Sequence, residues 1–414
     1  MRPSLTDPLD AAAPAVLDWP TLFARRSERA GDKITAILSL AASTDVITFS
    51  GGFPAPETFP APLLQTLLPR VLAEGAGTAL QYSPTEGLPR ARQAVAGLVT
   101  YTQGRAVDPA DVLITSGGIE GLQLLTRMLV EPGDRVLVEA PSYLGAIMAF
   151  AGFEADVEGV PIDTDGLQVD ALAAALARGR RPKLLYVIPD HQNPSGVSLA
   201  EERRRPVVEL CRRHGVPIVE DVAYRELGFD GTARTSLWSL APELVVQLGT
   251  FSKILAPGFR LGWAVGPAPL LAAMTAAKQN SDQCAGAFGQ TVMAEYVLGG
   301  HLPGALATAR GLYRRRAGLM LDALAAHMPA GVSWTRPAGG FFVWLTAPEH
   351  VDTRDLVAEA TRLGVAFVPG APFYPGPGGA NRLRLAYSRV ADSSIEVGIG
   401  RLATLLRETG PGQP

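Results

Sequence analysis

Short apolar runs alternate with amphipathic stretches through the middle of the chain. From about residue 110 onward, aliphatic and β-branched residues are concentrated in the runs 112–115, 135–139, 183–188, 217–220, 244–248 and 261–265. The stretch 200–214, which separates two of these runs, has charged residues on one helical face and apolar residues on the other. Apolar strands that alternate with helices are typical of the α/β class. We therefore predict a large domain with a mostly parallel central sheet that is sandwiched by helices.

The pattern changes after about residue 300. A long, arginine-rich amphipathic helix is predicted over 306–327, and an aromatic strand is predicted over 340–345. A helix-like segment, 22–40, lies near the start of the chain. We expect three parts: an N-terminal arm or helix over residues 1–50 that associates with the small domain, a large domain over 51–300 that would bind any cofactor, and a C-terminal small α+β domain over 301–414.

Composition narrows the class of partner. The chain has 414 residues, of which 47% are hydrophobic, enough for a large core and a second domain. The net charge of −3 comes from mixed acids and bases, so we expect no binding to nucleic acid or anionic lipid, and small molecules as partners. The charge-free stretch 261–277 has only 17 residues and is interrupted by Gly and Pro, which predicts no membrane span there.

Cysteine usage predicts the compartment. Only two cysteines occur, without the spacing of a metal site, so neither a disulfide framework nor a bound metal is expected. The amino terminus lacks the long apolar core of a signal peptide. These features indicate a soluble protein of the reducing cytoplasm.

The segment 249–263 places one lysine, Lys253, among apolar neighbours. Burial disfavours the ammonium form and leaves a free amine that can form a Schiff base with a carbonyl group. Two hydroxyls, Thr250 and Ser252, and the fixed charge of Arg260 are groups that bind a phosphate ester. A ligand with both an aldehyde and a phosphate suggests pyridoxal phosphate. A surface lysine beside a turn is the alternative interpretation.

Two loops that follow predicted strands carry residues suited to the same cofactor, because ligands of open α/β sheets bind at the carboxyl ends of strands. The glycine-rich segment 116–121 precedes a helical run, 122–129, whose first free amides favour phosphate. Tyr143 can stack on a pyridine ring. An ordinary strand-to-helix turn and a core tyrosine are the respective alternatives.

Two further loops carry polar residues. Asn193 can donate a hydrogen bond to a phenolate oxygen, although the sequence around it is also ordinary turn chemistry. Asp221 ends a predicted buried strand and needs a partner, for which a protonated pyridine nitrogen is well suited. That pairing would make the ring an electron sink, and Tyr224 can hydrogen-bond the phenolate oxygen. A structural aspartate that caps a loop is the alternative.

The segment 381–388 alternates polar and apolar residues as a half-buried strand does. Arg382 and Arg384 then lie on one face of the strand. An arginine in such a position can clamp a substrate carboxylate through two hydrogen bonds. A pair of surface arginines is the alternative.

In order and spacing, these motifs resemble those of fold-type-I, pyridoxal-phosphate-dependent aminotransferases of class I/II. The similarity covers about residues 45–390 and is greatest to the subgroup of 2-aminoadipate and kynurenine aminotransferases and the effector domains of MocR-type regulators. The resemblance implies that Lys253 forms the Schiff base and shuttles protons. It also implies that Asp221 pairs with the pyridine nitrogen, and that Tyr224 and Asn193 contact the phenolate oxygen.

The resemblance assigns the remaining residues of the site. It implies ring stacking by Tyr143, phosphate binding by Thr250, Ser252, Arg260 and the backbone amides of Gly118 and Ile119, and substrate binding by Arg384, Asn193 and the backbone of Gly52. Tyr82 resembles a tyrosine that reaches the phosphate of the neighbouring subunit. The resemblance therefore implies a homodimer with shared active sites.

The activity implied is a ping-pong transfer of an amino group from an L-α-amino acid to a 2-oxo acid, either 2-oxoglutarate or pyruvate. Aminoadipate-type members of the family have an arginine in the N-terminal helix that recognises the far end of the substrate. In this chain the corresponding position is Thr35 or one of its neighbours, with Lys33 close by. The sequence is therefore equally consistent with an apolar, aromatic or otherwise neutral amino donor and with a donor that carries a second carboxylate. We expect the choice of donor to depend on the N-terminal helix and on segments 281–289 and 369–374.

Two other functions use the same motifs. The cofactor site can also serve a lyase, a decarboxylase or a racemase, because fold and cofactor do not fix which bond at the α-carbon breaks. The second alternative is the ligand-sensing module of a transcription regulator. The slightly negative charge, and a segment before Ser50 too short for a winged-helix domain, argue against the sensor.

Overall fold

The computed structural model describes residues 17–24, 27, 46–232 and 234–409. Its centre is an eight-stranded sheet in the order β2-β9-β8-β7-β6-β3-β4-β5. The strands are β2 (Val112–Thr115), β3 (Arg135–Ala140), β4 (Asp156–Asp163), β5 (Gly166–Leu167), β6 (Leu184–Val187), β7 (Ile218–Asp221), β8 (Val245–Thr250) and β9 (Gly262–Val265). The five neighbours from β8 to β4 are parallel, whereas β9 runs antiparallel to both β2 and β8. The predicted mostly parallel sheet is confirmed.

Each of the six predicted apolar runs forms a strand of this sheet, and their residues are almost completely buried. The strands β4 and β5 were not predicted from the sequence. In β4 the sequence mixes acids, glycine and proline with valine and isoleucine, and most of its residues are half-buried or exposed. Its position beside the edge of the sheet, with only the short β5 beyond it, removes the need for a continuous apolar run.

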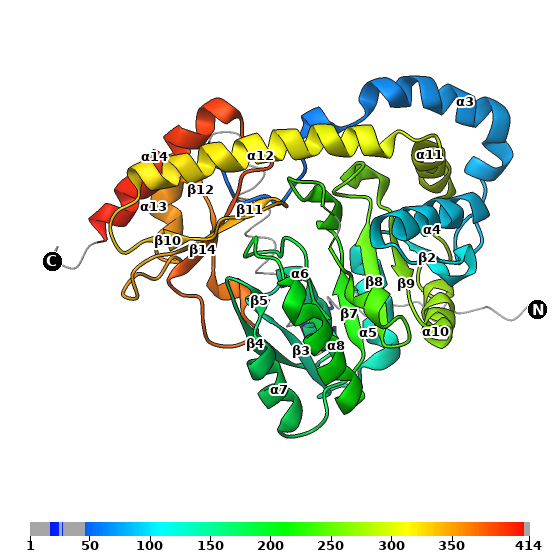
Figure 1. The fold of residues 1–414 in the computed structure, drawn as a ribbon, viewed down its shortest axis with the longest axis horizontal. Helices are drawn as coiled ribbons and strands as arrows, with labels where there is room; N and C mark the ends of the chain where they lie inside the picture. The colour runs from blue at the N-terminus through cyan, green and yellow to red at the C-terminus, as the bar shows by residue number, and fades with distance from the viewer. Residues whose placement is uncertain (1–16, 25–26, 28–45, 233, 410–414) are drawn as a thin grey trace, which may run out of the picture.

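Helices pack around the large sheet (Figure 1). They are α4 (Pro89–Gln103), α5 (Gly118–Leu129), α6 (Leu144–Gly152), α7 (Val169–Ala177), α8 (Glu201–His214), α9 (Leu237–Leu240), α10 (Ala268–Gln279) and α11 (Ala287–Leu298). The predicted amphipathic helix is α8, which has acidic residues in its first turn and basic residues in its last, and so complements the helix dipole. It ends at Gly215, whose φ of 64° is the left-handed conformation of a helix cap.

A second, antiparallel sheet has the strand order β10-β11-β14-β13. Its strands are β10 (Ser333–Trp334), β11 (Phe342–Thr346), β13 (Val368–Pro369) and β14 (Arg382–Ala386). The helices α13 (Val357–Arg362) and α14 (Asp392–Glu408) belong to the same part of the chain, and the long α12 (Leu302–His327) packs along α14. Figure 1 shows α12 running from beside this small sheet towards α11. The predicted helix 306–327 and aromatic strand 340–345 are thus confirmed.

The N-terminal part joins the C-terminal part through a two-stranded parallel sheet. In it β1 (Ile47–Thr48) pairs with β12 (Val365–Ala366). The chain then continues into α3 (Ala61–Ala79), which packs on α11. The helix α1 (Trp19–Leu22) ends where the predicted helix 22–40 begins. Most of that predicted helix, with Lys33 and Thr35, lies outside the described residues. The proposed boundaries at residues 50 and 300 remain a prediction.

A buried charge cluster fixes the loop that follows β6. The carboxylate of Asp190 accepts hydrogen bonds of 2.6 Å from both Arg204 and Arg225, and all three side chains are at most 4% exposed. Arg204 also donates to the backbone carbonyls of Pro189 and Leu199. Because every charge has an opposite partner and further hydrogen bonds, the cluster can remain buried and hold the loop in one conformation.

In the described part of the chain, no helix combines the length and the apolar character needed to cross a membrane.

Candidate active site

A cavity of about 330 Å³ opens at one edge of the large sheet. Its lining includes every residue that the sequence predicted for the site except Tyr82, namely Gly52, Gly118, Ile119, Tyr143, Asn193, Asp221, Tyr224, Thr250, Ser252, Lys253, Arg260 and Arg384. The side chain of Tyr82 is outside the cavity, and the residue is 79% exposed.

Strand direction explains why residues distant in sequence meet here. The carboxyl ends of β3, β6, β7 and β8 lie at the same edge, because these strands are parallel. The antiparallel β9 separates β8 from β2, so the carboxyl end of β2 points to that edge as well. For the same reason β9 begins there, which places Arg260, two residues before it, beside the ends of the other strands.

Lys253 follows β8 and faces the cavity. Its Nζ donates a hydrogen bond of 2.8 Å to the carbonyl oxygen of Gly52. Burial and the nearby charge of Arg384 lower the pKa of the Lys253 amine to about 8, although the carboxylate of Asp221 opposes this shift. A larger fraction of this amine is therefore neutral near physiological pH than for an exposed lysine.

Asp221 is the last residue of β7 and is held by two donors. Its Oδ2 accepts a hydrogen bond of 2.7 Å from the hydroxyl of Tyr186, and its Oδ1 accepts one of 3.0 Å from the amide of Ala223. Burial raises the pKa of Asp221, and these hydrogen bonds and the charge of Lys253 partly offset the rise. A cationic ring nitrogen is a suitable partner for this half-buried carboxylate, which lines the cavity.

Asn193 contacts another predicted residue, Arg384. Its Oδ1 accepts a hydrogen bond of 2.9 Å from Nη1 of Arg384, and both Asn193 and Tyr224 line the cavity. Arg384 lies on β14, so the small sheet contributes directly to the cavity. A second donor of Arg384, Nη2, contacts the carbonyl of Ser50 at 2.6 Å. Burial lowers the pKa of Arg384 to about 10, so it remains a cation at neutral pH.

Donors suited to a phosphate group gather at another part of the cavity. The hydroxyls of Thr250 and Ser252 lie 3.0 Å apart, and both residues are buried. Gly118 and Ile119 are the first residues of α5, so their amides lack partners within the helix. The guanidinium of Arg260 lies against Gly117, where a Cβ atom would be only 2.8 Å from Nη2. Gly117 has a φ of 100°, which also favours glycine.

Tyr143 precedes α6 and lines the cavity with its half-buried side chain. Burial, with a contribution from the charge of Asp221, raises the pKa of Tyr143 to about 12, so the phenol stays protonated. The backbone beside it is tied to the C-terminal part of the chain, because the amide of Ser142 donates a hydrogen bond of 2.8 Å to the carbonyl of Phe373, in the 3-10 helix Ala371–Phe373.

The structure reveals residues that the sequence did not point to. Tyr186 lies inside a fully apolar strand, where nothing marks it as the partner of Asp221. Phe373 lines the cavity, and Phe342 packs against the backbone that lines it at Gly52. Glu139 is buried behind the site, and its Oε2 accepts hydrogen bonds from Ile188 and Gln192. Burial raises the pKa of Glu139 to about 8.

The donor set fits pyridoxal phosphate. One part of the cavity offers two hydroxyls, a guanidinium and free helix amides, which suit a phosphate. Another part offers an amine of lowered pKa, a half-buried carboxylate, an amide and two phenols, which suit the substituents of the pyridine ring. The buried Nε of Arg384 has no hydrogen-bond partner in the protein, and the cationic side chain lines the cavity, which suits an anionic group of a substrate. Fold and site together define a fold-type-I enzyme dependent on pyridoxal phosphate.

Comparison with known proteins identifies the family. The family model of aminotransferase class I and II matches residues 44–402. The chain is 38% identical to the aromatic-amino-acid aminotransferase 1 of Thermococcus litoralis, over 95% of this chain and 97% of that protein. The chain therefore belongs to the class I and II aminotransferases, which the sequence motifs had indicated, and it is a pyridoxal-phosphate-dependent amino-acid aminotransferase.

Two solved structures agree with this assignment. The kynurenine aminotransferase of Pyrococcus horikoshii, in complex with PMP, superimposes with a TM-score of 0.92 at 36% identity and covers 95% of this chain and 99% of its own. The α-aminoadipate aminotransferase LysN of Thermus thermophilus, complexed with N-(5'-phosphopyridoxyl)-L-leucine, has a TM-score of 0.88 at 38% identity and covers 95% and 99% of the two chains.

Proposed function

We propose that this aminotransferase takes an amino group from an L-α-amino acid at Lys253, in the cavity between the two sheets, and passes it to 2-oxoglutarate or pyruvate in ping-pong half-reactions. The observation that carries the proposal is the joint placement of Lys253, Asp221 and Arg384 around one cavity. They are respectively an amine of lowered pKa, a half-buried carboxylate and a buried cation whose Nε has no hydrogen-bond partner.

The proposed roles follow from the contacts. Bound pyridoxal phosphate supplies an aldehyde for exchange with amines and a ring that withdraws electrons. Asp221, oriented by Tyr186, would pair with the positive charge of the ring nitrogen, while Thr250, Ser252, Arg260 and the start of α5 would hold the phosphate. Tyr143 would pack on the ring, and Tyr224 and Asn193 would hold its phenolate oxygen.

Substrate orientation is assigned to the small sheet. Arg384 binds the α-carboxylate together with Asn193, and the backbone at Gly52 lines the substrate side of the cavity. We assign Lys253 as the base for the proton of the α-carbon, because its contact with the Gly52 carbonyl places the amine on the substrate side of the cavity. Its lowered pKa of about 8 leaves more of the amine neutral than in an exposed lysine. Displacing the carboxylate by about 1 Å is expected to cost on the order of 10²-fold in rate.

We infer an apolar or aromatic donor side chain. Phe53, Leu144 and Phe373 line the cavity, and its charged lining residues, Asp221, Lys253, Arg260 and Arg384, are already assigned to the cofactor or the α-carboxylate. The names of two relatives, an aromatic-amino-acid aminotransferase and a kynurenine aminotransferase, fit this proposal, whereas LysN is named for α-aminoadipate, which carries a second carboxylate.

We also propose a homodimer located in the cytoplasm. Tyr82 is 79% exposed in the single chain, as expected for a side chain that completes the site of a second subunit. A cytoplasmic location is supported by the two cysteines, neither of which forms a disulfide.

A single-turnover experiment tests the activity. The cofactor-loaded protein is mixed with each of a panel of amino acids in the absence of a 2-oxo acid, with Lys253→Ala as control. One equivalent of 2-oxo acid per site, followed by renewed turnover when 2-oxoglutarate or pyruvate is added, supports the proposal. Repeated release of carbon dioxide or ammonia, or loss of chirality without amine transfer, would instead show a decarboxylase, lyase or racemase.

Subunit complementation tests the shared site. Tyr82→Ala and Lys253→Ala proteins, each impaired alone, are unfolded together and refolded as a mixture. If Tyr82 serves the partner, mixed dimers contain one intact site and activity returns. Activity no greater than that of the Tyr82→Ala protein would place Tyr82 outside the site of the second subunit.

A further inference from the structure

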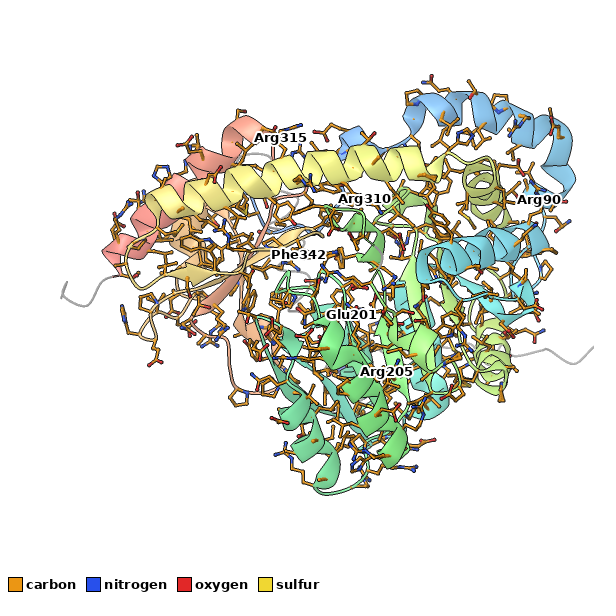
Figure 2. The ribbon with its side chains drawn as sticks, in the orientation of Figure 1. Arg90, Glu201, Arg205, Arg310, Arg315 and Phe342 are labelled. Carbon is orange, nitrogen blue, oxygen red and sulfur yellow. The ribbon has the colours of Figure 1, made fainter. Side chains whose placement is uncertain are left out.

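The guanidinium of Arg384 lies over the rings of two phenylalanines. Its Cζ lies 4.5 Å from the ring centroid of Phe342 and 5.0 Å from that of Phe373. Both phenylalanines are at most 1% exposed, and Arg384 is 6% exposed. Phe342 comes from β11, next to β14 in the small sheet, and Phe373 comes from the short 3-10 helix Ala371–Phe373. Figure 2 shows Phe342 in the middle of the molecule, at the end of β11 that approaches the large sheet.

The hydrogen-bond partners of Arg384 leave its charge uncompensated. Within the described residues, its partners are the side-chain oxygen of Asn193 and the backbone carbonyl of Ser50, both neutral. Its Nε is buried without a partner. No carboxylate of the described residues forms an ion pair with it, in contrast to the buried Arg204 and Arg225, which share Asp190. A buried cation without a counter-ion is costly unless other groups stabilise it.

The two rings can supply this stabilisation without occupying the hydrogen-bonding edge. An aromatic face attracts a cation, and the attraction is largest where water is excluded. A guanidinium donates hydrogen bonds in its own plane, so rings over its faces leave the N–H groups free for a carboxylate. A carboxylate on this protein would have neutralised the cation and competed with a substrate for the same donors.

Neighbouring aromatic residues hold both rings in place. Phe342 has an edge contact with Tyr224, with ring centroids 5.6 Å apart. Phe373 has an edge contact with Trp344 at 5.6 Å and 89°. The rings therefore form a continuous series from the proposed phenolate contact, Tyr224, to the small sheet, with Arg384 inside it. Small movements of either ring would reach the guanidinium directly.

We propose that Phe342 and Phe373 are positioning residues that keep Arg384 as an unpaired, oriented cation, for which the α-carboxylate of the substrate is the counter-ion. The inference rests on the proposed role of Arg384 in substrate binding. Beyond that role, we infer that the affinity of Arg384 for a carboxylate depends on the electron-rich faces of the two rings as well as on their size.

The test compares the binding of two unreactive probes to the cofactor-loaded protein by calorimetry, without turnover. The probes are 3-phenylpropanoate and its neutral primary amide. We expect the preference for the acid over the amide to fall by about 5- to 30-fold in Phe342→Leu and in Phe373→Leu, the effect of one desolvated cation–π contact. Phe367→Leu is the matched control, because Phe367 is 1% exposed and does not line the cavity; it should retain the preference.

A second variant separates ring electronics from packing. With 3,4,5-trifluorophenylalanine in place of Phe373, the shape of the ring is nearly kept but its negative face is weakened. The acid preference should fall here too, with an unfolding temperature close to that of the wild type. If a leucine variant fails to fold, the fluorinated variant still tests the positioning role. A preference that the fluorinated ring leaves unchanged would overturn the proposal and reduce the rings to packing.

These binding measurements distinguish a failure of the proposed role of Arg384 from a failure of the positioning role of the two rings. If the wild type itself does not prefer the acid, Arg384 is not the carboxylate site, and that part of the proposed function fails. If the wild type prefers the acid and the ring variants do so equally, only the positioning role fails. For turnover with an amino acid, a positioning role predicts a raised KM with a smaller change in kcat, which Phe367→Leu should not reproduce.

Discussion

The amine of Lys253 donates a hydrogen bond of 2.8 Å to the carbonyl of Gly52, although the two residues are 201 positions apart in the chain. The contact joins the loop after β8 to the segment that follows β1, which pairs with the C-terminal β12. The amine is therefore enclosed by both ends of the chain as well as by the large sheet. This enclosure removes water from around the amine and lowers its pKa.

The first prediction concerns the pH at which Lys253 becomes reactive. Because burial and Arg384 lower its pKa to about 8, the neutral amine accumulates as pH rises through about 8, below the range of an exposed lysine. In cofactor-free protein, the rate of its modification by an amine-directed reagent should be half-maximal near that pH. The chain has only four lysines, so peptide mass spectrometry can follow Lys253 separately.

Two variants should move this midpoint in opposite directions. Arg384→Gln removes a positive charge and should raise the midpoint, whereas Asp221→Asn removes a negative charge and should lower it. A wild-type midpoint above pH 10, or shifts of the same sign in both variants, would contradict the electrostatic account of Lys253.

A second prediction concerns the hydroxyl of Tyr186, which orients Asp221. Tyr186→Phe removes the 2.7 Å hydrogen bond and retains the ring, including its edge contact with Phe150. A hydrogen bond to a charged group contributes about 1.5–3 kcal/mol, so the dissociation constant of pyridoxal phosphate should rise by roughly 10- to 100-fold. Equilibrium dialysis of the cofactor measures this change. Unaltered affinity would show that the amide of Ala223 alone suffices to orient the carboxylate.

The third prediction concerns the close approach of Gly52 to Phe342. A Cβ atom on Gly52 would lie 2.6 Å from Cζ of Phe342, which is fully buried and has little space to move. Gly52→Ala should destabilise the protein by about 1–3 kcal/mol, as overpacked cores do, and raise KM for the amino donor. Gly258→Ala is the control, because nothing lies within 4 Å of its Cβ position. Chemical unfolding and steady-state kinetics measure the two effects, and equal behaviour of the two variants would argue against the contact.

The fourth prediction concerns stability in acid. Burial raises the pKa of Asp190, but the charges of Arg204 and Arg225 outweigh burial and lower it to about 2. A carboxyl group whose pKa is lower in the folded state stabilises the protein above its unfolded pKa of about 3.9, and the stabilisation is lost as pH falls towards 2. Asp190→Asn should therefore destabilise by about 3–5 kcal/mol at pH 7, because it leaves two arginines buried without a counter-ion.

The difference between Asp190→Asn and wild type should shrink as pH is lowered from about 4 to 2, which urea unfolding across that range can measure. Asp163→Asn, which breaks a partly exposed pair with Arg203, serves as the control and should cost at most about 1 kcal/mol. A loss at pH 7 no larger than that of the control would contradict the role assigned to the buried cluster.

The periodicity of the sequence was sufficient to predict the strands that carry the site. The runs that became β2, β3, β6, β7, β8 and β9 are apolar because helices or other strands cover them on both sides, and such burial leaves a direct trace in residue type. The strand β4 was missed because it lies next to the edge of the sheet, where mixed residues are tolerated. The short pairs β1 and β12 were missed because two residues carry no period.

The sequence by itself determined the chemistry of the site: a lysine in an apolar segment, hydroxyls and an arginine beside it, and polar residues at the ends of apolar strands, in the order of the family. Only the tertiary structure decided which other side chains contact these groups and hold them in position. Tyr186 and Phe342 belong to buried strands in which an aromatic residue is expected for packing alone. The contact of Tyr186 with Asp221 joins residues 35 positions apart, and the contact of Phe342 with Arg384 joins two neighbouring strands. The physical reason is that burial and periodicity depend on local residue type, whereas a hydrogen bond or a cation–π contact depends on the distance between two side chains, which only the packing of sheets fixes.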